Sequence, residues 1–169
     1  ETSLAETFSE WVHNLNMNDI PKEVVNKLQL VVMDSFGLMV SAKNQQYIKS
    51  LMNALKENGD CTLVGHNKKV NPFNASIING TAIHGEDFDD TFEGTPVHVG
   101  SVMVPAILSS AQAINLDGQK FLKGLVVGSE LICRLALVAP TAVHRQGFHP
   151  TAIFGAFGSS IGVSSLLGN

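Results

Sequence analysis

Three long segments of this 169-residue chain contain no aspartate, glutamate, lysine or arginine, and this restricts its possible folds more than any other feature. The segments are residues 70–83, 94–116 and 146–169. Each is long enough for a helix, and a helix at the surface of a small domain needs one polar face in contact with water. Because the remaining residues are too few to bury three such helices easily, we expect some of their packing partners to lie outside this chain.

The last of these segments is apolar enough, from Thr151 to Leu167, to be compared with a membrane span. Several serines and the glycines Gly155, Gly158 and Gly162 interrupt it, however. Small residues at this spacing are typical of helices that pack closely against another helix. We therefore predict no membrane segment, and we expect much of the neighbouring helix to lie beyond Asn169.

Hydrophobic periodicity and helix-capping residues predict seven helices. A Ser3–Glu6 capping box precedes the first, and Pro21 stands in the first turn of the second. Pro105 should be tolerated only near the start of the fifth, because proline inside a helix removes a hydrogen bond. The predicted helices cover about residues 4–15, 21–40, 47–55, 72–84, 101–114, 121–139 and 151–167.

One segment, Cys61–Val64, is the only good candidate for a strand or a short extended arm, and it ends in a polar turn that runs to Lys69. The sequence has no internal repeat and no linker-like stretch. The pattern as a whole therefore predicts an all-α fold, in which residues 1–169 form part of one helical domain.

Charge and cysteine content exclude several classes of function. With 11 lysines and arginines and a net charge of -4, the chain has no basic stripe for phosphates, so we predict no nucleic-acid partner. Cys61 and Cys133 are too few for a disulfide framework, a four-cysteine zinc site or an iron-sulfur cluster held by thiolates alone. Residues 1–10 carry glutamates and no basic residue, unlike a secretory or transit peptide. We expect a reducing compartment, which is the cytoplasm, or the mitochondrial matrix if the organism is a eukaryote.

Five of the 15 acidic residues lie between Glu86 and Glu93. Such crowding should raise the pKa of at least one carboxyl group unless a cation or hydrogen-bond donors compensate. The simplest interpretation is a solvated loop between two buried helices. A calcium loop is excluded because Phe92 stands where an EF-hand needs glycine, and His84 and His98 lack the spacing of paired zinc ligands. We therefore predict no metal site.

Three of the six histidines, His84, His98 and His149, border the uncharged segments, where an unpaired imidazole is costly to bury. A single histidine in such a place is usually a hydrogen-bonded core residue. His98 and His149, however, each stand in a loop that leads into a predicted helix, and helix amino ends favour anions. If both imidazoles converge on the acidic stretch, they would form a proton-transfer site.

No nucleophile motif competes with this interpretation. The sequence contains no Gly-x-Ser-x-Gly, and the glycines of the last segment match neither a P-loop nor a dinucleotide-binding fingerprint. Cys133 lies within an apolar helical pattern, so we interpret it as a core thiol rather than a catalytic one.

Three motifs in their order along the chain resemble those of the MmgE/PrpD family. They are His84-Gly85-Glu86-Asp87-Phe88-Asp89-Asp90-Thr91, then Pro96-Val97-His98, then Gly147-Phe148-His149-Pro150-Thr151. This family includes 2-methylcitrate dehydratase, cis-aconitate decarboxylase and iminodisuccinate epimerase. The resemblance extends over nearly the whole chain, and the motifs are specific for the family but not for one member.

The resemblance implies roles for individual residues. Asp87, His98 and His149 are implied as catalytic residues, the histidines in proton transfer and in binding the substrate anion. Thr91 is implied to line the active site, and we expect Thr91 and His84 to contact the substrate. The chemistry implied is proton transfer next to a carboxylate without any cofactor, since the two distant cysteines cannot hold an aconitase-type cluster locally.

The resemblance also implies how the whole protein is organised. The family fold is a large helical domain with a smaller α+β lid, usually in a homodimer. Residues 1–169 would be the first part of the helical domain, without the lid and the downstream cationic residues that a di- or tricarboxylate needs. We therefore expect these residues to be inactive by themselves.

The leading hypothesis is a cofactor-independent lyase of the 2-methylcitrate dehydratase type, which removes a proton next to a carboxylate and releases water. A cis-aconitate decarboxylase or an iminodisuccinate epimerase would use the same motifs on a similar small carboxylate. A non-catalytic helical interaction module is the alternative from a different class.

Overall fold

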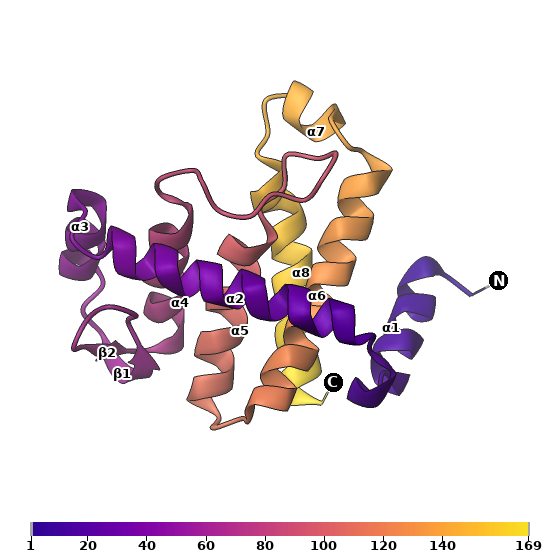
Figure 1. Ribbon diagram of the computed structural model, residues 1–169, viewed down its shortest axis with the longest axis horizontal. Coiled ribbons are helices and arrows are strands. Elements are labelled where there is room, and N and C mark those ends of the chain that lie inside the picture. The colour runs from indigo at the N-terminus through magenta and orange to yellow at the C-terminus, as the bar shows by residue number, and fades with distance from the viewer. Residues whose placement is uncertain (1, 169) are drawn as a thin grey trace.

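The computed structural model describes residues 2–168, and helices dominate that part of the chain (Figure 1). This confirms the all-α fold class, with one small two-stranded sheet added to it. The α-helices are α1 (Leu4–Asn14), α2 (Lys22–Ala42), α3 (Gln46–Ala54), α4 (Pro72–His84), α5 (Val99–Ala113), α6 (Gly118–Val138), α7 (Ala142–Arg145) and α8 (Pro150–Leu167). A short 3-10 helix covers Met17–Asp19, and the strands are β1 (Asn58–Thr62) and β2 (Lys69–Val70).

Side-chain caps fix several helix starts where the sequence predicts them. Ser3 and Glu6 form the complete capping box of α1. At α4, the side chain of Asn71 accepts a hydrogen bond from the Asn74 N–H at 2.8 Å, directly before Pro72. Each cap satisfies backbone N–H groups that have no partner inside the helix, so the helix begins at a defined residue.

Pro105 lies in the middle of α5, and the prediction that it belongs near the helix start is wrong. Proline cannot donate to the carbonyl of Ser101 one turn earlier. Gly80 of α4 packs against this interruption, because a Cβ at Gly80 would lie 3.2 Å from the Ser101 carbonyl oxygen and 3.3 Å from the Pro105 ring. The absence of a side chain at Gly80 therefore allows α4 and α5 to approach closely at this proline.

The strand prediction near residues 61–64 is correct in kind but not in extent. β1 ends at Thr62 and pairs antiparallel with β2, a second strand that the sequence does not signal. Two residues are too few to show an alternating pattern. Asn79 of α4 anchors the hairpin, because its amide donates to the Thr62 carbonyl at 2.9 Å and accepts from the Val64 N–H at 3.1 Å. The four-residue helix α7 is likewise without a sequence signal.

The interior is organised around the crossing of α6 and α8, with α5 beside them and α2 running across α4, α5 and α6 (Figure 1). A Cβ at Gly128 would lie 2.6 Å from the Gly158 carbonyl oxygen, and one at Gly162 would lie 2.9 Å from the Gly124 carbonyl oxygen. Small residues thus bring the two backbones together. The expectation that the helix packed on α8 lies largely beyond Asn169 is wrong, since α6 and α5 occupy that position.

Two helices, α2 and α8, are long and apolar enough to cross a membrane by length and composition alone. In α8 one side is buried against α5 and α6, as in the core helix of a folded domain. Its other side leaves large apolar side chains exposed, among them Ile153, Phe157 and Leu167. The prediction that some packing partners lie outside this chain agrees with that exposed face but is not tested by it.

Candidate functional site

The three histidines singled out in the sequence lie at ends of the helices α4, α5 and α8. His84 is the last residue of α4, His98 is the N-cap of α5, and His149 is the N-cap of α8. The prediction that His98 and His149 stand directly before helix starts is therefore confirmed. The long connection between α4 and α5 carries the acidic residues into the same region.

The starts of α5 and α8 are tied to each other through Thr151. Its hydroxyl oxygen accepts a hydrogen bond from the backbone N–H of His98 at 3.0 Å, and its side chain is buried. Ser101 donates to the His98 carbonyl at 3.1 Å from inside α5. These two bonds fix the backbone N–H and the carbonyl of His98, and so they fix the position from which its side chain extends.

His84 is the centre of the histidine cluster, which we define as His84, His98 and His149. Its ring centroid lies 4.9 Å from that of His98 and 5.3 Å from that of His149. The His84 and His149 rings are nearly parallel, with an interplanar angle of 16°, and their Nε2 atoms are 3.1 Å apart. The three imidazoles predicted from the sequence are thus brought together.

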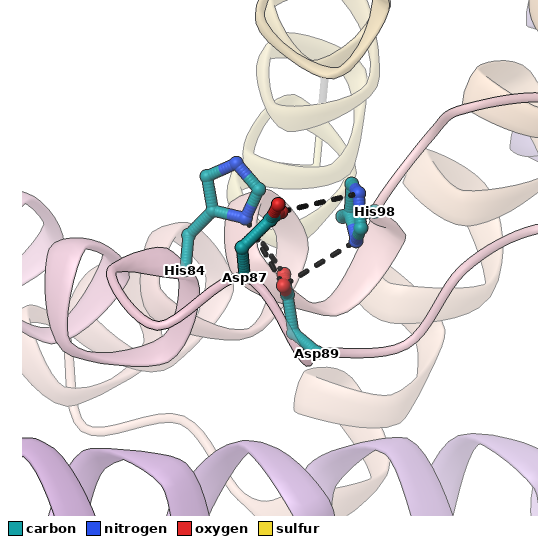
Figure 2. A group of neighbouring side chains, drawn as sticks. All are labelled: His84, Asp87, Asp89 and His98. Atoms are coloured by element: carbon teal, nitrogen blue, oxygen red, sulfur yellow. Dashed lines mark hydrogen bonds and ion pairs between the residues drawn. The ribbon is translucent and has the colours of Figure 1, made fainter.

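Asp89 lies beneath this cluster, and its side chain has 0% exposure. Its carboxylate oxygens are 3.0 and 3.1 Å from His84 Nδ1, and Oδ1 is 3.3 Å from His98 Nδ1. Figure 2 shows the carboxylate between the two rings. One buried carboxylate therefore contacts two of the three histidines.

The other predicted site residues of the acidic stretch lie on the open side of the cluster. The side chain of Asp87 is 81% exposed, and its Oδ1 is 4.0 Å from His98 Nε2 (Figure 2). Asp87 has a positive φ of 55°, which turns the chain between His84 and Asp89. The hydroxyl of Thr91 lies 3.5 Å from His98 Nδ1. The predicted residues Asp87 and Thr91 are therefore beside His98 and accessible to a ligand.

Asp90, next to Asp89, has a structural contact instead. It accepts a hydrogen bond from the Gly100 N–H at 2.9 Å and so caps α5 from a distance. Burial raises the pKa of Asp90, the Gly100 hydrogen bond lowers it, and the neighbouring Asp89 raises it. A raised carboxyl pKa in this stretch was expected from crowding, but burial is the larger cause. The interpretation of the stretch as a simple solvated loop is wrong for Asp89 and Asp90.

Gly100 is required for this arrangement. A Cβ at this position would collide with Asp90 Oδ1 and would lie 2.9 Å from the Val31 side chain of α2. At the start of the loop, Tyr47 of α3 donates its hydroxyl to Glu86 at 2.7 Å, and burial raises the pKa of Tyr47 to about 12. The loop is therefore held at both ends by contacts outside the histidine cluster.

The environment of His149 favours its neutral form. Partial burial of the ring lowers the pKa of His149, and the nearby imidazoles of His84 and His98 lower it further. Asp87 acts in the opposite direction, and His144 adds to the lowering. A histidine with a lowered pKa is neutral near pH 7 and can accept a proton.

A pocket of about 300 Å³ opens beside the His84–His149 pair. His84, His149 and Thr151 line it together with small or apolar residues of α4, α5 and α8, such as Gly80, Val102 and Ala152. The first N–H groups of a helix have no intrahelical partner and favour anions. The pocket therefore lies at the start of α8 and against the two imidazoles, where a small anion would be favoured.

The donor atoms of His84, Asp87, Asp89 and His98 all lie within 4.8 Å of one another (Figure 2). Imidazole nitrogens and carboxylate oxygens are metal donors, so this set meets a first geometric condition for a divalent ion. In the structure the same atoms are engaged with each other, since Asp89 contacts His84 and His98 directly. The prediction that the site uses no metal stays a prediction.

The surroundings of Cys133 agree with the prediction that it is a core thiol. It packs against the hydrophobic core, and burial raises its pKa to about 11. At neutral pH it is therefore the thiol and not the nucleophilic thiolate.

Two residues of the site have no individual signal in the sequence. Asp89 is one of five neighbouring acids, and only the fold distinguishes it as the buried one. Thr151 looks like an ordinary residue in the first turn of a helix, and its contact with His98 spans 53 positions. A spacing of five residues between His84 and Asp89, across a tight turn, is the one hint that those side chains can meet.

Comparison with known proteins adds independent information to this geometry. The profile of the MmgE/PrpD N-terminal domain matches residues 6–169. The match includes α4, α5 and α8, the three helices that carry the histidine cluster. The resemblance inferred from the motifs is therefore confirmed.

Curated relatives carry similar descriptions across distant organisms. A cis-aconitate decarboxylase-like protein, oryM, of Aspergillus oryzae is 27% identical over 99% of this chain and 37% of its own length. The cis-aconitate decarboxylase of Homo sapiens is 27% identical over 98% of this chain, and one from Aspergillus terreus is 22% identical over 99%. The chain spans about a third of the length of the curated relatives it matches.

Proposed function

Because this chain belongs to the MmgE/PrpD family, we propose that it carries part of the active site of a lyase that acts on a small di- or tricarboxylate. The observation that carries the proposal is the contact between His84 and His149 at the start of α8, with their Nε2 atoms 3.1 Å apart and the His149 pKa lowered beside a pocket of about 300 Å³. This arrangement supports proton transfer to or from a carbon next to a carboxylate.

In the proposed reaction, His149 exchanges the proton and the helix starts bind the substrate anion. A proton removed next to a carboxylate leaves enolate-like negative charge, which hydrogen-bond donors must meet. Beside the pocket, the first N–H groups of α8 that follow Pro150 are such donors among the described residues. Asp87 and Thr91, both beside His98, would orient that ring and contact the substrate.

Among the reactions that these residues can serve, we propose decarboxylation of cis-aconitate or of a closely similar tricarboxylate. The support is the description of the curated relatives as cis-aconitate decarboxylases, at 22 to 27% identity. In such a step the bond to one carboxylate breaks, carbon dioxide leaves, and His149 delivers to carbon a proton that its ring has taken up from solvent. Dehydration of 2-methylcitrate would use His149 in the opposite direction, as the acceptor of a proton from carbon, and releases water instead.

One assay decides between these reactions. The intact protein is incubated separately with cis-aconitate, 2-methylcitrate and iminodisuccinate, and the products are measured by mass spectrometry and by release of carbon dioxide. We expect carbon dioxide from cis-aconitate. Water loss from 2-methylcitrate would favour the dehydratase, inversion of iminodisuccinate the epimerase, and no turnover of any of them a non-catalytic helical module.

The homodimer and the cytoplasmic or mitochondrial location are proposals that rest on the family resemblance. Light scattering of the intact protein tests the first, and cell fractionation tests the second. Neither affects the assignment of the histidine cluster, whose residues all come from one chain.

A further inference from the structure

Asp89 differs from the other acids of its stretch in that it is buried without a cationic partner from lysine or arginine in the part of the chain described here. Burying an uncompensated carboxylate is costly. The contacts that compensate Asp89 are the Nδ1 atoms of His84 and His98, at 3.0 and 3.3 Å. The role of Asp89 therefore lies in its effect on the His84 and His98 rings.

A carboxylate can only accept hydrogen bonds. His84 Nδ1, which is hydrogen-bonded to Asp89, must therefore carry the hydrogen. His98 Nδ1 lies 3.3 Å from the same carboxylate and 3.5 Å from the Thr91 hydroxyl, and a lone pair on this nitrogen would face the negative charge, so the carboxylate favours a hydrogen here as well. Each neutral ring then has its lone pair on Nε2. For His98, Nε2 faces the open side of the site, where Asp87 Oδ1 is 4.0 Å away. For His84, Nε2 faces His149 Nε2 at 3.1 Å.

Two nitrogens at 3.1 Å need one hydrogen between them. Because Asp89 leaves His84 Nε2 without a hydrogen, the Nε2 of His149 is the donor, and the lone pair of neutral His149 is on Nδ1. When Nδ1 of His149 accepts a proton, the positive charge on His149 is shared with His84 through this hydrogen bond. The negative charge of Asp89 stabilises it. No bond other than the N–H bond forms or breaks in this step.

We propose that Asp89 is the positioning residue of the site, and that it selects the Nδ1–H tautomer of both His84 and His98. It thereby orders a hydrogen-bonded series from Asp89 through His84 to His149. In this arrangement both nitrogens of His84 are engaged by protein groups, so His84 acts on the reaction through His149. The proposal rests on the proposed function for its effect on turnover, but its effect on the tautomers does not depend on any activity.

The first test is a direct measurement of the tautomers in the intact protein with 15N-labelled histidine. Protonated and unprotonated ring nitrogens have well-separated 15N chemical shifts, which long-range 1H–15N spectra record at about pH 8, above the ordinary histidine pKa of about 6.5. We expect His84 and His98 to be Nδ1–H and His149 to be Nε2–H. An Nε2–H tautomer at His84 or His98 would overturn the proposal, as would a stoichiometric metal ion bound through either Nδ1.

The second test replaces Asp89→Asn, which removes the charge at nearly constant size. An amide has one accepting oxygen and one donating nitrogen, so it cannot accept from both rings in the same way. We expect at least one of the two histidines to change tautomer, and kcat to fall by about 10²-fold or more with a much smaller change in KM. Unchanged tautomers together with unchanged kcat would overturn the assignment.

The matched control is Glu93→Gln, which makes the same charge change in the same loop at an exposed side chain. It should change neither the tautomers nor kcat, and an equal loss in both variants would overturn the role of Asp89 in favour of a general charge effect. If Asp89→Asn does not fold, the spectra of the unmodified protein still decide. If the protein acts on none of the carboxylates, the proposed function fails, and the same spectra still confirm or overturn the tautomers.

Discussion

The crossing of α6 and α8 and the histidine cluster at the end of α8 are built on the same helix by opposite means. At the crossing, glycine backbones touch, and a Cβ at Gly158 would lie 2.8 Å from the Gly128 carbonyl oxygen. At the cluster, the contacts are hydrogen bonds between side chains that come from loops and helix starts. The packing at the crossing depends only on side-chain volume, whereas the contacts in the cluster depend on which ring nitrogens carry hydrogens.

In α8, therefore, the residues that stabilise the fold are separate from the residues proposed to take part in the reaction. A close-packed crossing tolerates few changes of volume and has no group that titrates. The cluster contains three titratable rings, and the side-chain exposure rises from 15% at His98 through 31% at His84 to the exposed His149. Substitutions in the two regions should therefore change different measured quantities.

The largest effect is expected from His149→Gln in the cluster. The variant removes the proposed proton acceptor, so kcat of the intact protein should fall by about 10³-fold. The melting temperature should remain nearly constant, because His149 is an exposed residue. The control is His144→Gln, an exposed histidine of α7. Steady-state kinetics measure the effect, and turnover within a few fold of the unmodified protein would remove His149 from the reaction.

The next largest effect is expected at the crossing, from Gly158→Ala. The added Cβ would collide with Ile132 and with the Gly128 carbonyl oxygen. The free energy of unfolding should fall by about 2 kcal/mol, as is usual when a packed interior receives an extra carbon. Urea denaturation measures this change. A neutral or stabilising result would show that the two helices are less closely packed than described.

A smaller effect of opposite sign is expected from Gly37→Ala, the matched glycine in a helix interior. A Cβ at Gly37 in α2 would meet no atom within 4 Å. Alanine favours the helix over glycine, so the free energy of unfolding should rise by about 0.5 to 1 kcal/mol. The same urea experiment detects it, and a loss of stability would mean that glycine has another function at this position.

The smallest effect is a change of pH dependence from Asp90→Asn beside the cluster. Burial raises the pKa of Asp90 in the folded protein, so the unmodified protein loses stability as the pH rises from the unfolded carboxyl value toward the folded one. The asparagine oxygen can still accept from Gly100, and the variant lacks this titration. Its stability relative to the unmodified protein should therefore increase over that pH range and then level off. A relative stability that falls with rising pH would contradict the burial of Asp90.

The helices and their first residues could be predicted from the sequence because their signals are local. Capping residues, prolines and a repeat of apolar residues lie within a few positions of the helix they specify, as at Ser3 and Pro72. The strand β2 and the place of Pro105 within α5 could not, because contacts with α4 decide them. The sequence does not identify α6 as the partner of α8 for the same reason, since the glycines of α6 match those of α8 only once the two helices pack together.

The histidines of the site could be predicted from the sequence. Which carboxylate contacts which of them could not. His98 and His149 are recognisable as loop residues before helices, and the motif carries Asp87 and Thr91. The separation of Asp89 from Asp90 depends on which carboxylate turns toward His84 and which toward Gly100. Adjacent residues of identical chemistry are distinguished only by the folded backbone.

The pKa of His149 in the intact protein is the measurement that tests this account most directly. The charged or titratable groups that face it are His84, His98, Asp87 and His144, with Asp89 behind His84. A partly buried histidine in contact with the His84 ring and near the His98 ring should titrate below the ordinary value of 6.5, and NMR of the labelled ring should show it neutral at pH 7. A midpoint at or above 6.5 would contradict the packing of the three rings and with it the assignment of His149 as the proton acceptor.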